Sequence, residues 1–149
     1  MKQLASILCL MFLLNLGVLA QESQTIYSRH ASSKVINEGT SVKITLQLEN
    51  KVFRKKLRLI ELLPMGMTVE SIEAPGARIE PVDEKRITFE WANVPANSTT
   101  EVVYHLVAFR EIGENIRING ALYDDVGMLF QSKETVLNKK GEVRLIPSH

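Results

Sequence analysis

Apolar and polar side chains alternate along several short stretches of this chain. The clearest stretch is residues 42–49, in which a valine, an isoleucine and two leucines alternate with Lys, Thr, Gln and Glu. A period of two predicts a strand with one buried face and one solvated face. Residues 87–91 repeat the pattern, and Trp91 is expected to be the largest core side chain of that strand.

Two further runs, residues 57–63 and 102–109, are apolar at both odd and even positions. Such runs predict strands that are covered on much of both faces. Shorter strand-like runs lie at residues 67–72, 78–82 and 128–136. No helical period is visible after the first twenty residues, so the pattern indicates an all-β domain.

Proline, glycine and asparagine separate these runs. Pro64 should end a strand because proline cannot donate into a ladder, and Gly66 supplies a turn position that tolerates positive φ. Residues 74–76 and 95–98 carry similar turn signals. About seven or eight strands with turns about every 8–12 residues are typical of an immunoglobulin-like antiparallel β-sandwich. We predict that fold, with a jelly roll or a small barrel as alternatives.

The first twenty residues differ from the rest. Lys2 precedes an apolar run at residues 4–14, shorter than the roughly 20 residues that span a bilayer. This predicts a helical secretory signal peptide at residues 1–20, cleaved after Ala20, with an uncleaved anchor as the alternative. Cys9, the only cysteine, would leave with it. A secreted domain without disulfides points towards a bacterial envelope, either the periplasm or the cell surface.

Charge and length suggest the organisation of the mature chain. Loss of Lys2 would reduce 18 basic residues to 17, equal to the 17 acidic ones. A neutral domain has no net field that attracts nucleic acid, and after signal cleavage no run is long enough for an integral membrane segment. We expect residues 21–34 to be a polar leader or an edge strand. Residues 35–138 would form the immunoglobulin-like sandwich, and residues 139–149 a basic C-terminal tail.

Five motifs follow one another in a recognisable order. A Gly-x-x-Val strand start lies in residues 38–44, a Leu-Pro-x-Gly-x-x-Val turn at 63–69, and a Trp strand with its turn at 91–98. A long apolar strand follows at 100–109, and an Ile-x-Gly motif at 118–121. In this order the chain resembles a bacterial surface family, the conserved-repeat domain known as domain of unknown function eleven.

That resemblance implies an immunoglobulin-like fold and a place in cell-envelope or cell-surface proteins. Members of the family usually occur as repeats in large surface proteins, whereas this chain has one copy. Asn97 stands where the family usually has glycine. Asparagine can adopt the left-handed conformation that such a turn position needs.

No catalytic or metal-binding set is recognisable. His30, His105 and His149 are far apart, and no serine lies in a Gly-x-Ser-x-Gly elbow. Paired histidines or cysteines with metal-ligand spacing are absent, as are nucleotide-binding loops. We therefore expect no enzymatic activity, cofactor or metal. A hydrolase that uses His105 in an unrecognised site is the least favoured hypothesis.

A run of basic residues is the sharpest local charge feature. It comprises Lys51, Arg54, Lys55, Lys56 and Arg58. The run could bind phosphate, an acidic glycan or an acidic partner, but we favour a solvated strand edge that blocks edge-to-edge association. Asp124 and Asp125, just before Gly127, could bind calcium but are interpreted as a hairpin turn.

The preferred hypothesis is a secreted, non-enzymatic accessory subunit that binds an envelope or surface protein. The candidate contact residues are Val103, Val107 and Phe109, on the outer face of the long apolar strand. If residues 26–27 or 143–146 cover this face, it is not available to a partner. Strand addition at a sheet edge is a second possible binding mode.

The alternative hypothesis is a module that binds glycan or cell wall. Trp91 or Tyr123 would then be the stacking platform for a sugar ring. Trp91 alternates with core residues, which argues against its exposure.

Overall fold

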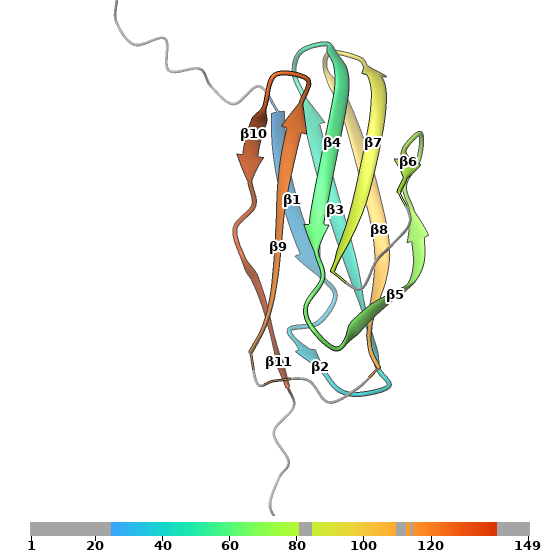
Figure 1. Cartoon of the computed structure of the whole chain (residues 1–149), viewed down its shortest axis with the longest axis vertical. Coiled ribbons are helices and arrows are strands. Elements are labelled where there is room, and N and C mark those ends of the chain that lie inside the picture. The colour runs from blue at the N-terminus through green and yellow to red at the C-terminus, as the bar shows by residue number, and fades with distance from the viewer. Residues whose placement is uncertain (1–24, 81–84, 110–112, 114, 140–149) are drawn as a thin grey trace, which may run out of the picture.

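A computed structural model describes residues 25–80, 85–109, 113 and 115–139. Within these residues the chain forms eleven strands in two sheets and no helix, so the all-β, immunoglobulin-like sandwich prediction is confirmed (Figure 1). This part of the chain therefore contains no helix that could span a membrane. The predicted signal peptide at residues 1–20 lies outside the described residues, as does most of the tail at 139–149.

The smaller sheet has four antiparallel strands in the order β1-β3-β8-β5. Their bounds are Thr25–Ala31 for β1, Ser41–Asn50 for β3, Ser98–Ala108 for β8 and Met67–Glu73 for β5. The alternating stretch at 42–49 is the body of β3, and its apolar side chains are buried as expected. Residues 25–31 form an edge strand, which is one of the two possibilities predicted for the leader segment.

The larger sheet has the order β2-β11-β9-β4-β7-β6, and β10 also pairs with β9. The bounds are Val35–Ile36 for β2, Arg54–Leu62 for β4, Arg78–Ile79 for β6, Arg86–Val94 for β7, Asn115–Asp124 for β9, Met128–Gln131 for β10 and Thr135–Lys139 for β11. All pairs are antiparallel except β2 with β11.

The single strand predicted at residues 128–136 is wrong. The chain forms β10 and β11 instead, and both pair with β9. Between them the ladder is interrupted at residues 132–134, where the Ser132 hydroxyl and the Lys133 carbonyl accept hydrogen bonds from Arg29. The break between the two strands therefore coincides with a long-range polar contact.

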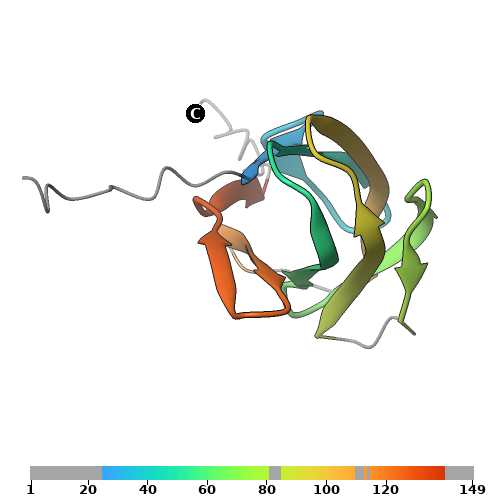
Figure 2. The same ribbon diagram turned by 90° about the horizontal axis from the view of Figure 1, so that it is seen from above.

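The two sheets approach each other closely on the side where β1 lies next to β10 (Figures 1 and 2). Tyr27 of β1 packs edge to face on Phe130 of β10, with ring centroids 6.0 Å apart. This aromatic contact brings the N-terminal edge strand against the hairpin formed by β9 and β10.

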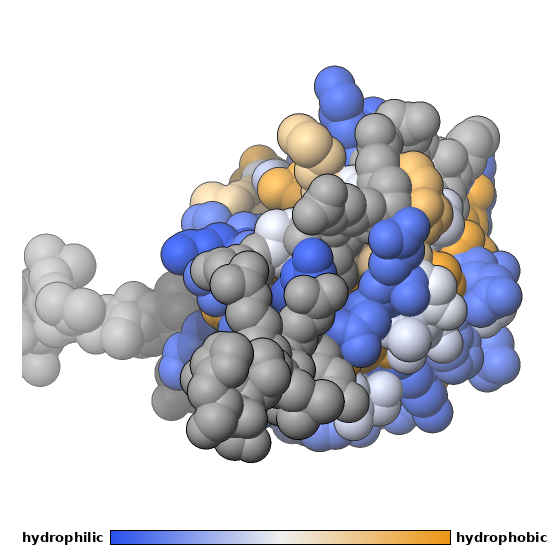
Figure 3. Space-filling view, turned by 90° about the horizontal axis from the view of Figure 1, so that it is seen from below, coloured by the Kyte–Doolittle hydropathy of each residue, from blue (hydrophilic) through white to orange (hydrophobic). Residues whose placement is uncertain are grey.

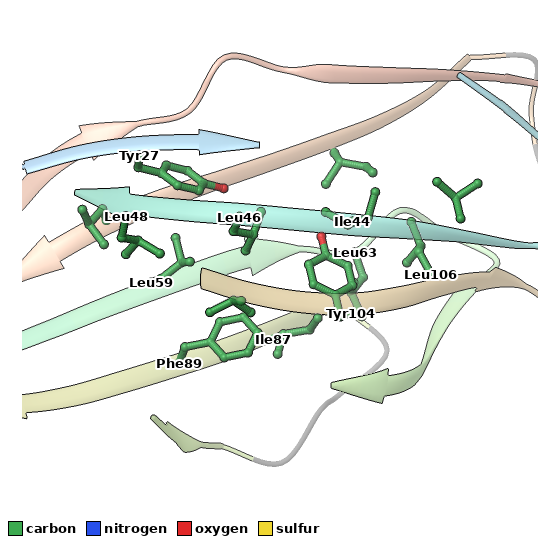
Figure 4. Close-up of a cluster of buried hydrophobic side chains, with 14 of the residues drawn as sticks. Tyr27, Ile44, Leu46, Leu48, Leu59, Leu63, Ile87, Phe89, Tyr104 and Leu106 are labelled. Atoms are coloured by element: carbon green, nitrogen blue, oxygen red, sulfur yellow. The ribbon is translucent and has the colours of Figure 1, made fainter. Parts of the chain in front are cut away.

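Inward side chains from both sheets fill the core between them (Figure 4). Trp91 is 6% exposed, stacks on Phe89 and donates its indole N–H to the Pro75 carbonyl at 3.1 Å. The prediction that Trp91 is a core residue is therefore confirmed.

The predicted turns have the expected backbone conformations. Gly66 has φ of 82°, and the Met67 N–H donates to the Pro64 carbonyl at 3.2 Å. Gly76 has φ of 70° in a similar turn. Asn97 has φ of 53°, so asparagine does occupy a left-handed turn position.

Candidate functional site

The three predicted contact residues lie on or beside β8. Val103 and Val107 are half-buried at outward positions of the strand, and Phe109 follows it with 46% of its surface exposed. Ile26 and Tyr27 do not cover this face, because β1 lies in the same sheet with Tyr27 in the core and Ile26 exposed. Residues 143–146 lie outside the described residues. No strand of the described part of the chain packs on this outer face.

Polar neighbours surround the two valines. Val103 pairs in register with Thr45 of β3 and Glu73 of β5. Val107 lies in the same way between a serine of β3 and a threonine of β5. The face is therefore a pair of valines in a polar frame, which a protein surface can contact, rather than a broad apolar patch.

The end of the sandwich where β2 and β5 lie is not a continuous apolar surface either. Figure 3 shows hydrophobic residues there as separate patches among hydrophilic ones. Single exposed apolar side chains are common on soluble proteins and indicate no binding site by themselves.

His105 lies between Val103 and Val107 on the outer face. Its Nδ1 is 2.8 Å from the Ser71 hydroxyl of β5, so its hydrogen bond goes to a serine and not to a carboxylate. Among the described residues, no group of three or more His, Cys, Asp or Glu side chains could hold a metal ion. The hydrolase hypothesis required carboxylates around His105, whereas the hydrogen bond described for its ring goes to Ser71.

The basic run from Lys51 to Arg58 does not converge on one point. Four of its five members have a side-chain partner within the fold. The pairs are Lys51 with Glu49 at 3.5 Å, Arg54 with Asp124 at 2.6 Å, Lys56 with Glu90 at 2.7 Å, and Arg58 over the Tyr123 ring at 5.6 Å from its centroid. Lys55 is exposed. This distribution argues against a single anion site. The prediction of a strand edge is wrong, because β4 lies between β9 and β7 and both of its edges are paired.

Asp124 organises the hairpin between β9 and β10. Its Oδ1 accepts the N–H groups of Val126 at 2.8 Å and Gly127 at 2.9 Å, as the hairpin-turn interpretation requires. Burial acts to raise the pKa of Asp124, but these N–H groups and the Arg54 cation outweigh it. The pKa therefore lies below its ordinary value of 3.8.

The most unusual feature is a buried ion pair that the sequence did not reveal. Arg29 of β1 and Glu61 of β4 are 2.7 Å apart, with side chains 2% and 0% exposed. The hydroxyls of Tyr27 and Tyr104 both donate to the Glu61 carboxylate. Figure 4 shows these two hydroxyls inside the sandwich. Burial, followed by the charge of Glu61, raises the pKa of both tyrosines.

Arg29 also binds the larger sheet directly. Its Nη1 donates to the carbonyls of Ile118 at 3.1 Å and Lys133 at 3.2 Å, and its Nη2 to the Ser132 hydroxyl at 3.0 Å. Gly120 leaves the space for this cluster, because a Cβ there would clash with the Glu61 carboxylate. Every charge is paired and the carboxylate is inaccessible, so the cluster holds the sheets together and offers no reactive group.

One signal in the sequence could have indicated this cluster. Glu61 has the same parity as Leu57 and Leu59, so the alternation places a carboxylate on the buried face of β4. A buried carboxylate requires a cation nearby. The position of Arg29 could not be read in this way, because it lies in a polar segment 32 residues earlier.

Comparison with known proteins agrees with the fold and gives no family. No profile of a known family and no curated protein sequence matches the chain. Among solved structures, a non-cellulosomal cohesin from Archaeoglobus fulgidus has a TM-score of 0.50 at 13% identity. The alignment covers 78% of this chain and 93% of the cohesin.

Two further solved structures have similar scores. The collagen-binding domain of a Staphylococcus aureus adhesin has a TM-score of 0.51 at 11% identity, covering 77% of this chain and 97% of that domain. AvmM, which catalyses macrocyclization in alchivemycin A biosynthesis, has a TM-score of 0.54 at 8% identity and covers 83% of this chain and 93% of AvmM. At these identities the likeness establishes the β-sandwich fold alone, since binding domains and an enzyme share it.

Proposed function

We propose that this chain is a secreted, non-enzymatic β-sandwich module that binds another protein of the bacterial cell envelope or surface. The observation that carries the proposal is the outer face of the smaller sheet, where Val103 and Val107 lie in a polar frame that no described strand covers. The motif order shared with the conserved-repeat family and the signal-like residues 1–20 support an exported location.

The outer face of the smaller sheet is a better candidate for the contact surface than either of the edge strands of that sheet. On β5 the register shifts between Val69 and Ser71, and such a bulge hinders the addition of another strand. The other edge strand, β1, packs against β10 through Tyr27 and Phe130. We therefore assign recognition to side chains of the sheet face rather than to strand addition.

The glycan-binding alternative has less support. Trp91 is 6% exposed and its indole N–H is bound to Pro75, so its ring does not form a platform. The guanidinium of Arg58 lies over the ring of Tyr123. Trp91 therefore offers no stacking platform, and a cation already occupies one face of the Tyr123 ring.

Photo-crosslinking from Val103 tests the proposal. A photoreactive amino acid would replace Val103 in the full chain, expressed in its own cells. Val126, 92% exposed at the end of the sandwich, is the matched control position. We expect an adduct with another polypeptide from position 103 alone. That polypeptide, once purified, should bind a Val103→Arg variant at least about tenfold more weakly than the wild type. Equal adducts from both positions, or none from 103, would contradict the proposal.

A further inference from the structure

The outer faces of the two sheets carry charges of opposite sign. On the smaller sheet the charged residues at outward positions and at the end of β3 are two lysines and four carboxylates, namely Lys43, Lys51, Glu49, Glu70, Glu73 and Glu101. On the larger sheet they are five cations and three carboxylates, namely Lys56, Arg58, Arg78, Arg86, Arg117, Glu80, Glu90 and Glu134. A formally near-neutral chain is thus acidic on one side and basic on the other.

The basic charge is concentrated in one row across the larger sheet. Glu90 of β7 pairs in register with Arg78 of β6 on one side and Arg58 of β4 on the other. Lys56 adds an ion pair to the same carboxylate at 2.7 Å. The Lys56 hydrogen bond, followed by the charges of Lys56, Arg78 and Arg58, lowers the pKa of Glu90. Three cations around one carboxylate leave a local excess of positive charge.

Each face also has apolar residues among its charges. On the larger sheet, Ile60 is half-buried and Leu62 is 50% exposed at outward positions of β4. On the smaller sheet, Val103 and Val107 are half-buried at outward positions of β8. Each face therefore has two outward apolar residues among polar and charged ones, and the net charges of the two faces differ in sign. Such surfaces are complementary to each other.

We propose that the basic outer face of the larger sheet docks onto the acidic outer face of the smaller sheet in a second copy of this chain. This deepens the proposed function, because it uses the same face around Val103 and Val107 and names its partner. The two contact surfaces are different, so the contact is heterologous and each added copy presents both faces again. The copies would stack head to tail.

Charge reversal on each face provides the test. One variant carries Arg58→Glu with Arg78→Glu, and the other carries Glu73→Lys with Glu101→Lys. The control carries Lys34→Glu, at an exposed lysine outside the strands of both sheets. Sedimentation velocity of the full mature chain would be measured at about 20 mM and about 500 mM salt, since screening weakens contacts between exposed charges.

We expect wild type and control to form concentration-dependent species larger than dimers at low salt, and to dissociate at high salt. For each face variant alone, the concentration at which half of the chains are associated should be at least about tenfold higher than for the wild type. An equimolar mixture of the two variants should associate again, because the reversed charges are complementary.

The inference is overturned if the wild type is monomeric at low salt, or if only the control variant loses association. It is also overturned if the mixture of the two folded variants stays monomeric. Circular dichroism and urea midpoints equal to wild type show that both variants are folded. A monomeric wild type that still crosslinks another polypeptide from Val103 would refute self-association while leaving the proposed binding function intact.

Discussion

Arg29 and Glu61 join the two sheets through a buried ion pair. Arg29 lies on β1 of the smaller sheet and Glu61 on β4 of the larger sheet. Two tyrosine hydroxyls and backbone carbonyls of the larger sheet satisfy the remaining hydrogen-bonding groups of the pair. A buried ion pair whose hydrogen-bonding groups are all satisfied fixes the relative position of the two sheets. If one partner is removed, the other charge stays buried without compensation, which is strongly destabilising.

Glu61→Gln should strongly destabilise the domain. The substitution keeps the shape of the side chain but leaves the Arg29 cation buried without a counter-charge, which costs about 3–5 kcal/mol. Urea denaturation with circular dichroism measures the change. Glu134→Gln breaks an exposed pair with Arg117 and should cost no more than about 1 kcal/mol. Similar losses in the two variants would show that the buried pair has no special role.

Gly120→Ala should destabilise the domain although it adds only one methyl group. The new Cβ would clash with the Glu61 carboxylate and lie 2.9 Å from Nη2 of Arg29, so the ion pair must shift. We expect a loss of about 1–3 kcal/mol in urea denaturation. Gly127→Ala is the matched control, since nothing lies within 4 Å of its Cβ position. It should be neutral or slightly stabilising, and a loss as large as that of Gly120→Ala would contradict this explanation.

Stability should fall in alkaline solution because of Tyr27 and Tyr104. Burial, followed by the charge of Glu61, raises the pKa of both hydroxyls above the ordinary 10.0. In the unfolded chain they ionise near pH 10, so the stability they contribute is complete below that pH and is lost as the pH rises further. Urea midpoints measured from pH 8 to about 12 should decline, and less steeply in Tyr27→Phe. A Tyr27→Phe curve parallel to wild type would rule out this contribution.

Asp124 should contribute to stability at neutral pH and not in acid. Its pKa lies below the ordinary 3.8, so its charged form is favoured by folding. The contribution is present above that value and is lost as the pH falls through the lower, folded-state pKa. Asp124→Asn should therefore be about 1–2 kcal/mol less stable than wild type at pH 7. In urea titrations the difference between the two proteins should shrink as the pH falls below 3.8, and a constant difference would contradict the assignment.

The sequence predicted the features that depend on neighbouring residues. Alternation fixed which side chains of β3 face the core, and the left-handed φ of Asn97 followed from its place in the turn. Both depend on local geometry, which the chain carries in its own pattern. The parity of Val103 and Val107 was correct for the same reason.

Features that depend on distant residues could not be predicted. The polar frame of Val103 comes from Thr45 and Glu73, which only the strand register brings beside it. Ser132 and Lys133, between β10 and β11, accept hydrogen bonds from Arg29, more than 100 residues earlier. Neither pairing has a local signature, because a one-residue change of register would replace every cross-strand neighbour.

The reach of Arg29 has a consequence for how the chain folds during synthesis. Arg29 belongs to the first described strand, yet one of its hydrogen-bond partners, Thr135, lies 106 residues later in the last described strand. While β11 is still inside the ribosome, the nascent chain cannot complete this cluster. We therefore expect folding to be completed only after β11 has left the ribosome, and to be slow for a domain of this size, as contacts between distant parts of a chain require. A ribosome-stalled chain ending before residue 132 should be digested by protease, whereas the released chain should resist it.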